Sequence, residues 1–542
     1  MKVTIKTIII TLFVSCLSFT SCEDVILEKQ PLDQLSSTKF WNTPEDALLA
    51  LAGVYNKATS WSNIDHVSKF DCNTDNGIDR KANQSFLSYG TLNPATLEIK
   101  SYWNNSYREI AGCNYFLENI NRVKNLTDAK KVQMIAEVRF LRAFTYFNMS
   151  LYWGGVPLVT KILTMEESIT INSATKEEIV TFVLSELGAI ENDLPATRTV
   201  NEHGRIVKAA ALAIKGRLLM ADKKWADAAT AYKAIIDMGV HKIDPLYAEL
   251  FNGKNEASSE IIFSRKYLAG EIANSSQLFY RPSVDGGWHH INPFQSLVDS
   301  YLCKDGKPTS ESSLYDPLFP VVKKGVNYRD PRLLYTIFYP GISTIKGRMY
   351  QGHPDSTKVI GDVFTYDSGM TGYCLQKYVD NTYTGDVNSS GVDNPIIRYA
   401  EVLLSYLECK INSGSTIDQS LLNLTINAVR GRASVQMPAV SETDPKKLML
   451  VLKRERRVEL AYEGLRYWDL IRWGEAAEAL DNKPQYGIFL TKDPANYKRF
   501  PVGPNGHYFV INLKFKATNI PWPVPQDELD INTSMSQKDN WK

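Results

Sequence analysis

The feature of this sequence that most constrains its fold is the repeated spacing of large apolar residues. Along several stretches they recur at intervals of three and four, which places them on one face of a helix. A helix with one apolar face needs a second layer to cover it, so such helices pack in groups. The clearest stripes are Trp103, Tyr107, Ile110, Leu117 and Ile120; Phe140, Phe144, Phe147 and Leu151; and Ile397, Ala400, Leu404, Leu407 and Ile411. The chain is therefore predicted to be mainly α.

Three stretches have the form of a helical hairpin. They are residues 208–239, 396–431 and 445–473. In the first stretch, Gly216 and Tyr232 fall at small and aromatic positions of a tetratricopeptide repeat. Gly414 interrupts the second stretch and Gly464 the third, as expected where a helix ends. We predict a tetratricopeptide-like scaffold of stacked helical hairpins.

Between residues 246 and 395 the helical spacing fades, and Gly, Asn, Asp and Ser become frequent. This irregular region holds thirteen of the 28 tyrosines, together with Trp288. Loops on a rigid scaffold often carry binding residues, and aromatic faces stack on sugar rings and on peptide side chains. We therefore predict a large, loop-rich ligand-binding region. The expected organisation is a helical region at 22–245, the irregular region at 246–395, a second helical region at 396–480 and a closing segment at 481–542.

The first residues have the layout of a secretory signal. A positively charged start precedes an apolar run at 8–19, which is too short to span a membrane as a helix. The run leads into Phe19-Thr-Ser-Cys22, which resembles the lipobox of bacterial lipoproteins. The resemblance implies a signal peptide at 1–21 and a lipid on Cys22, which would anchor the protein in a membrane. Cys16 is the alternative position, but it would truncate the apolar run.

The charged residues give information on where the protein is located and on which partners it can bind. Glu23 and Asp24, directly after the lipobox, resemble the tag of lipoproteins that reach the outer cell surface. An outer-membrane protein that faces the exterior is therefore expected. Lys plus Arg number 61 against 60 Asp plus Glu, so the chain has no basic field that would hold nucleic acid.

The sequence predicts no cofactor, no metal and no catalytic residue. The cysteines after Cys22 are odd in number and lack a CxxC spacing, which predicts isolated buried thiols. The segment Asp71-Cys-Asn-Thr-Asp75 has part of a calcium-loop pattern, but Asn76 replaces the glycine and Ala82 the last carboxylate. The sequence also lacks the HExxH, GxSxG and GxxxxGK[ST] motifs.

The segment 453–473 is densely charged. The pairs with the i,i+3 separation at which helical side chains meet are Arg456–Glu459, Glu463–Arg466 and Asp469–Arg472. Each of these acids has an arginine nearby in sequence, and a neighbouring arginine keeps a carboxylate ionised. We therefore predict a structural ion-pair network here in preference to a catalytic pair.

Several motifs spread along the chain carry a family resemblance. They are Glu137–Phe147 with Gly154–Leu158, Ile397–Leu404 with Asn427–Ala433, Glu455–Trp473 and Pro521–Leu529. Together they resemble the SusD/RagB family of outer-membrane nutrient-binding lipoproteins. The resemblance implies a tetratricopeptide-like scaffold whose irregular face binds an oligosaccharide, with no chemistry. It also implies a SusC-type TonB-dependent transporter as the partner that receives the ligand.

The resemblance further implies two regions for the ligand site. Family sites draw on the loop before the Trp103 helix, which here supplies Asp71 and Arg80, and on the irregular region, which supplies Tyr280 and Trp288. For Asp71 and Arg80 a surface turn held by its own side chains is an equal alternative. For Trp288 the alternative is a packing role. Capture of an oligopeptide is the alternative function within the family; a surface glycosidase and a protein-interaction scaffold are alternatives outside it.

Overall fold

A computed structural model describes residues 40–58, 60–354 and 369–542 of the chain. The fold is mainly α, as predicted, and its strands are short and pair only two at a time. Among the helices so described, none combines the length and the apolar character that crossing a membrane requires. The predicted signal peptide and Cys22 lie outside the described residues.

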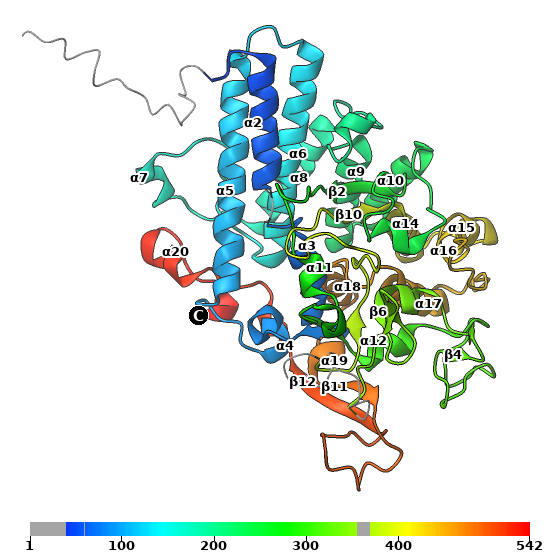
Figure 1. Ribbon diagram of the computed structural model, residues 1–542. Helices are drawn as coiled ribbons and strands as arrows, with labels where there is room; N and C mark the ends of the chain where they lie inside the picture. Colours follow the sequence, from blue (N-terminus) through cyan, green and yellow to red (C-terminus); the bar gives the residue numbers. More distant parts are fainter. Residues whose placement is uncertain (1–39, 59, 355–368) are drawn as a thin grey trace, which may run out of the picture.

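Four long helices form one side of the molecule. They are α2 (Pro44–Lys57), α5 (Leu97–Asn119), α6 (Asp128–Tyr152) and α8 (Lys176–Ile190), and they run side by side in Figure 1. The start of α2 is fixed locally, because Thr43 and Asp46 form a reciprocal capping box. The apolar stripe of α6 turns inward, so that Phe140, Phe144 and Phe147 are all buried.

The next hairpin packs in the manner of a tetratricopeptide repeat. Helix α9 (Lys208–Ala221) packs on α10 (Trp225–Asp237), which in turn contacts α14 (Tyr399–Asn412). Gly216 lets the two helices of the hairpin approach, since a Cβ there would lie 2.6 Å from the ring of the buried Tyr232. The small and aromatic positions recognised in the sequence therefore meet face to face.

The other two hairpins are less regular. The return arm after α14 is split at Thr425 into α15 (Gln419–Leu424) and α16 (Ile426–Arg430). In the third hairpin, α17 (Pro445–Glu459) and α18 (Arg466–Trp473) are separated by a turn in which Gly464 has a φ of 74°. That angle is in the left-handed region, which glycine adopts readily. Gly414 likewise has a positive φ, of 70°.

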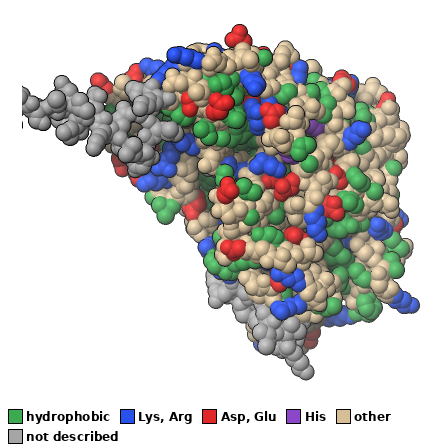
Figure 2. Space-filling model, turned by 45° about the horizontal axis from the view of Figure 1, so that its top comes forward, with side chains coloured by type: hydrophobic (Ala, Val, Ile, Leu, Met, Phe, Trp, Pro, Cys, Tyr) green, Lys and Arg blue, Asp and Glu red, His purple; other side chains and the backbone are tan. Residues whose placement is uncertain are grey.

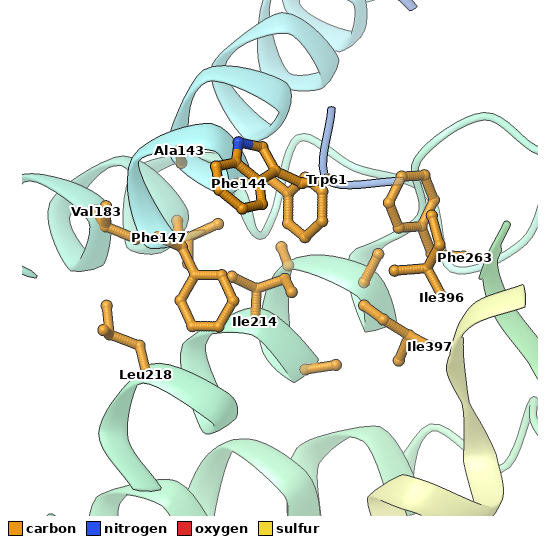
Figure 3. Close-up of a cluster of buried hydrophobic side chains, with 14 of the residues drawn as sticks. Trp61, Ala143, Phe144, Phe147, Val183, Ile214, Leu218, Phe263, Ile396 and Ile397 are labelled. Atoms are coloured by element: carbon orange, nitrogen blue, oxygen red, sulfur yellow. The ribbon is translucent and has the colours of Figure 1, made fainter. Parts of the chain in front are cut away.

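The helical scaffold and the start of the irregular region share one core. Figure 3 shows Phe144 and Phe147 of α6 turned toward Ile214 and Leu218 of α9, beside Phe263, Ile396 and Ile397. These last three belong to β2 (Ile261–Arg265) and β10 (Asn394–Arg398), which pair antiparallel. Because β2 begins the irregular region and β10 ends it, both ends of that region are attached to the helical core.

The irregular region has a second core of its own, in which several of its tyrosines are buried. The loop that contacts this region contains α3 (Ile64–Phe70), β1 (Gly77–Asp79) and α4 (Phe86–Tyr89). The elements of the irregular region itself are α11 (Ser276–Phe279), β3 (Ile291–Pro293), α12 (Gln295–Ser300), β4 (Val322–Lys323), β5 (Val326–Asn327), α13 (Arg332–Thr336), β6 (Ile337–Phe338), β7 (Thr344–Ile345), β8 (Arg348–Met349) and β9 (Cys374–Leu375). The tyrosine-rich composition thus serves packing as well as any binding surface.

The closing segment contributes a β-hairpin that the sequence analysis did not predict. Strands β11 (Asp481–Phe489) and β12 (His507–Lys514) project at the bottom of Figure 1. The short helices α7 (Met165–Ser168), α19 (Ala476–Leu480) and α20 (Gln526–Ile531) complete the fold. Between α20 and the strands, Trp522 is buried against Phe70, Tyr152 and Trp153, so the chain end is held in the core.

The charged segment 453–473 forms a buried ion-pair network, as predicted, but two of the three expected pairs are wrong. Asp469 does pair with Arg472, at 2.7 Å. Arg456 contacts Asp469 at 2.8 Å, while Glu459 is taken by arginines from other segments of the chain. Those arginines are Arg332, Arg398 and Arg432, at 2.9, 3.1 and 2.9 Å.

The second wrong pair has a simple geometric cause. Helix α17 ends at Glu459 and the chain turns at Gly464, so Glu463 and Arg466 do not share a helical face. Glu463 pairs with Arg398 at 2.7 Å, and Arg466 pairs with Asp75 at 2.9 Å. The five cysteines of the described chain are buried thiols, as predicted.

Candidate functional site

A short antiparallel ladder brings the two predicted ligand regions together. Strand β1 pairs with β3, and the register places Asp79 opposite Ile291. One residue further on, the backbone N–H of Arg80 donates to the carbonyl of His290 at 2.9 Å. Arg80 therefore lies directly across from His290, two residues after Trp288, although the two segments are far apart in sequence. Cross-strand neighbours of this kind have side chains within contact distance.

A tight turn holds Trp288 in place. Its backbone N–H donates to the carbonyl of Leu278 at 2.7 Å, and the N–H of His290 donates to the carbonyl of Phe279 at 2.8 Å. Gly287 is required between them, because a Cβ there would lie 2.1 Å from the carbonyl oxygen of Arg281. Gly287 thus serves a close backbone approach, and the turn holds the indole on a rigid support.

Three rings at this turn stack on one another. Trp288 lies 5.4 Å from Phe279 and 5.7 Å from His290, while Phe279 and His290 are 4.8 Å apart and nearly parallel. We call these three side chains the Trp288 platform. Trp288 is 43% exposed, whereas His290 is buried beneath it. An exposed indole on a rigid support is a flat apolar face that solvent leaves open to a ligand.

Three cationic side chains lie near the platform. The ammonium of Lys69, in the last turn of α3, lies 4.8 Å from the centre of the Phe279 ring. Helices α3 and α11, which carry Lys69 and Phe279, are neighbours in Figure 1. Arg80 lies opposite His290, and the exposed Lys81 follows it. We call Lys69, Arg80 and Lys81 the cationic rim.

His290, which lies buried beneath this exposed surface, has an unusual environment. Neither of its ring nitrogens has a hydrogen-bond partner, although the side chain is buried. Burial, reinforced by the charges of Lys69, Arg80 and Lys81, lowers the pKa of His290 to about 3. The imidazole is therefore neutral at physiological pH, and one of its nitrogens carries an N–H with no acceptor.

Two of the four predicted ligand residues do not reach the surface. Tyr280 is fully buried, and its hydroxyl shares a 2.6 Å hydrogen bond with Ser68. Asp71 is also fully buried, and its carboxylate accepts from the backbone N–H of Tyr462 at 2.6 Å. Neither side chain offers an atom that a ligand could touch in this structure. They belong to the packing under the site, whereas Trp288 and Arg80 remain candidates for contact.

The side chains of the calcium-loop pattern at Asp71–Asp75 bind donor groups of the protein itself. Asn73 accepts from the backbone of Leu87, and Asp75 forms ion pairs with Arg457 and Arg466. Across the ranges that the structure describes, no three His, Cys, Asp or Glu side chains gather in a way that could hold a metal ion. The pattern is explained by hydrogen bonding that closes the loop.

The platform contains residues that sequence reasoning missed. His290 adjoins Trp288 in the sequence, so its nearness could have been expected, but its burial could not. Lys69 and Phe279 gave no signal, because their contact joins two short helices from distant segments. These helices become neighbours only in the folded chain, where Ser68 of α3 hydrogen-bonds to Tyr280, the residue after α11, at 2.6 Å.

A second candidate surface lies elsewhere. A groove of about 1120 Å³ runs between α2, α5 and the loop after α6. Its aromatic wall is mostly core, since Trp41, Trp103 and Phe116 are buried, but Tyr115 is 41% exposed. On the face that Figure 2 shows, acidic and basic side chains are interspersed. The Trp288 platform is favoured over the groove because its exposed ring is larger, rigidly supported and bordered by polar groups.

Comparison with known proteins gives consistent matches along the chain. The profile of the family described as "SusD family" matches residues 259–541, and that described as "Starch-binding associating with outer membrane" matches residues 27–220. The chain is 24% identical to the SusD-like protein P25 of Formosa agariphila, over 99% of this chain and 98% of the relative. It is 25% identical to the starch-binding protein SusD of Bacteroides thetaiotaomicron, over 80% and 77%.

Solved structures agree with these matches. A SusD-like carbohydrate-binding protein from Bacteroides fragilis superposes with a TM-score of 0.85 at 36% identity, covering 92% of this chain and all of that one. A laminarin-binding SusD-like protein superposes with a TM-score of 0.65 at 21% identity, over 92% and 100%. At that lower identity the likeness concerns the fold alone.

Proposed function

Because the chain belongs to the SusD family, we propose that it is a glycan-binding surface protein that captures an oligosaccharide and does not transform it. The names of its relatives, which include starch-binding, laminarin-binding and carbohydrate-binding proteins, support a sugar ligand. The description of the matched N-terminal family as associating with the outer membrane supports that location. The observation that carries the proposal is the exposed indole of Trp288 on its stacked support.

The platform can bind a sugar by simple chemistry. The hydroxyls of an oligosaccharide are satisfied by water, but the C–H patches on its rings are not. A flat aromatic face gains free energy by covering such a patch, and a few polar groups then set the orientation. In this proposal Trp288 stacks on one sugar ring and Arg80 donates to its hydroxyls. Tyr280 and Asp71 support the loop from below and do not contact the ligand.

The test is Trp288→Ala, measured by titration calorimetry over a panel of oligosaccharides and by thermal melting. We expect the affinity to fall at least tenfold, because losing a central aromatic anchor typically costs about 2 kcal/mol or more. The melting temperature should change little, since the ring is nearly half exposed. Tyr115→Ala is the matched control, because that ring is similarly exposed but lies in the α2–α5 groove.

The two variants separate the possible results. If Tyr115→Ala abolishes binding and Trp288→Ala does not, the groove is the ligand site and the platform is not. If only peptides bind, the protein captures oligopeptides, the alternative function within the family. Release of reducing sugar from a bound polysaccharide would make the chain a glycosidase.

We also propose that the captured glycan passes to a SusC-type TonB-dependent transporter. The supporting observation is family membership over nearly the whole chain. Purification from native outer membranes in mild detergent should therefore recover a large TonB-dependent transporter together with this protein. Recovery of the protein alone, under conditions that preserve other membrane complexes, would contradict the proposal.

Membrane attachment is proposed to run through a lipid on Cys22. Labelling of cells with a palmitate analogue should be lost in Cys22→Ala and kept in Cys16→Ala. The physical reason is that several acyl chains, at roughly 0.8 kcal/mol per buried CH₂, hold a protein on a bilayer almost permanently. Cys22→Ala should then appear in the soluble fraction. The reverse labelling pattern would move the anchor to Cys16.

A further inference from the structure

We propose that the ligand bound at the Trp288 platform is an anionic glycan, whose carboxylate or sulfate ester contacts the cationic rim of Lys69, Arg80 and Lys81. This inference rests on the proposed function, since it assumes that a sugar stacks on Trp288. It adds the chemical class of that sugar, which the family does not specify.

The geometry places three cations near one aromatic surface, close enough for each of them to affect His290. Lys69 is positioned by α3 with its ammonium over Phe279, and Phe279 stacks on His290 and packs at a tilt against Trp288. Arg80 is fixed opposite His290 by the β1–β3 ladder. The exposed Lys81 follows directly, with its backbone N–H donating to the carboxylate of Asp79 at 2.7 Å. All three cations therefore lie near the platform, on supports that do not depend on a ligand.

The described acids near the platform have hydrogen-bond or ion-pair partners of their own. Asp79 and Asp71 are buried beneath the loop, where they accept from backbone N–H groups. Asp285, on the turn that precedes Trp288, forms ion pairs with Arg281 and Lys346. The charged residues that most affect the pKa of the buried His290 are Lys69, Arg80 and Lys81, and each of them lowers it.

His290 supplies a second, independent observation. Its ring is buried against the indole, and neither nitrogen has a partner. An unsatisfied N–H in a cationic neighbourhood calls for an acceptor, and a negatively charged oxygen is the best one available. A neutral hydroxyl could also accept, but it would gain less from the three nearby charges than an anion would.

A matched set of saccharides tests the inference by calorimetry. We would titrate oligogalacturonides, sulfated galactan oligosaccharides, and neutral galactan and glucan oligosaccharides of equal length. We expect one charged class to bind at least about tenfold more tightly than the neutral sugars, and its affinity to fall as salt rises from 50 to 500 mM, because exposed charges are screened. The first two arms distinguish a carboxylate from a sulfate.

Charge-removing variants locate the effect. Lys81→Gln should weaken the charged sugar roughly two- to fivefold, as for one exposed ion pair, and Lys69→Gln with Lys81→Gln should weaken it further. The matched controls are Lys130→Gln, on the exposed face of α6, and its double variant with Lys483→Gln, which remove the same charge elsewhere. The affinity for neutral sugars should be the same in both double variants as in the wild type. Thermal melts verify that all variants fold.

The outcomes distinguish this inference from the proposed function. If neutral sugars bind as tightly as charged ones, depend on Trp288, and ignore Lys69 and Lys81, the anionic ligand is excluded and glycan capture stands. If Trp288→Ala leaves every saccharide unaffected, both proposals fail at this surface. Failure of both charged classes to bind would also overturn the inference. Binding of acidic peptides in their place would assign the rim to a peptide carboxylate and overturn the glycan as well.

Discussion

At the scale of single residues, burial decides which groups under the platform carry charge. Burial raises the pKa of Asp71 to about 7, although hydrogen bonds from Asn76 and Tyr462 act in the opposite direction. Burial also lowers the pKa of His290 to about 3. The charged form is disfavoured in both cases because it would lose its hydration without full compensation. His290 is therefore neutral near physiological pH, whereas Asp71 is about half ionised at pH 7, and the positive charge at the site comes from the rim.

The raised pKa of Asp71 predicts a pH-dependent stability. In the unfolded chain this carboxyl loses its proton near pH 3.8, whereas in the folded protein it keeps the proton until about pH 7. Stability is therefore lost as pH rises between these values, by about 1.4 kcal/mol per unit of pH from this group. Asp71→Asn cannot titrate, so its free energy of unfolding relative to wild type should improve from pH 5 to pH 8. Urea unfolding of both proteins at each pH measures this difference in the free energy of unfolding. A difference that does not change with pH would contradict the raised pKa of Asp71.

At the scale of elements, the helical hairpins depend on close contacts at a few positions. Gly216 in α9 faces the ring of Tyr232 in α10, and Tyr232 is itself held in the core. The helix pair can therefore approach only if residue 216 has no side chain. Gly188, near the end of α8, is a contrast, because it is exposed and a Cβ there would meet nothing within 4 Å.

These two glycines make a matched pair of variants. Gly216→Ala should destabilise the protein by about 1–3 kcal/mol, because the added methyl overpacks against a ring that cannot move. Gly188→Ala should stabilise it by roughly 0.5–1 kcal/mol, because alanine loses less backbone entropy in a helix than glycine. Chemical denaturation of both variants measures the effects. Equal changes in the same direction would show that helix propensity, and not the contact with Tyr232, governs position 216.

At the scale of the whole molecule, a buried ion-pair network connects segments that are remote in sequence. Glu459, at the end of α17, binds Arg398 of β10 and Arg432 after α16. Those two arginines also share Glu260, next to β2, at 2.5 and 2.6 Å. Burial by itself would raise the pKa of Glu459, but the arginines around it lower the pKa to about 2. The network thus joins the irregular region to both helical regions.

Removing the central carboxylate should destabilise the whole fold. Glu459→Gln leaves buried arginines without their shared anion, and breaking such a pair typically costs about 3–5 kcal/mol. Glu478→Gln, on the exposed side of α19, is the control and should change stability by less than about 0.5 kcal/mol. Because the pKa is lowered, the contribution of Glu459 is fully present above about pH 4.5 and is lost as pH falls toward 2. Urea unfolding of both variants at pH 7 and pH 4 measures these effects.

Much of the scaffold could be predicted from the sequence, because helix formation depends on residues only three or four positions apart. The stripe that contains Phe144 and Phe147 and the Gly216–Tyr232 spacing are local patterns, and each has its expected structure. The family motifs extend over the same helices. The buried thiols also followed from their number and spacing.

The site was decided by the tertiary structure. Trp288 and Arg80 are neighbours only because β1 pairs with β3 in one register, and neither strand is long enough to show a pattern in the sequence. The burial of Tyr280 and Asp71, and the partners of Glu459, depend likewise on segments that meet after folding. The sequence by itself determined the main helices of the scaffold and the family to which the chain belongs. Packing between distant segments determined which polar side chains face the solvent, because exposure depends on everything around a residue and not on its neighbours in the chain.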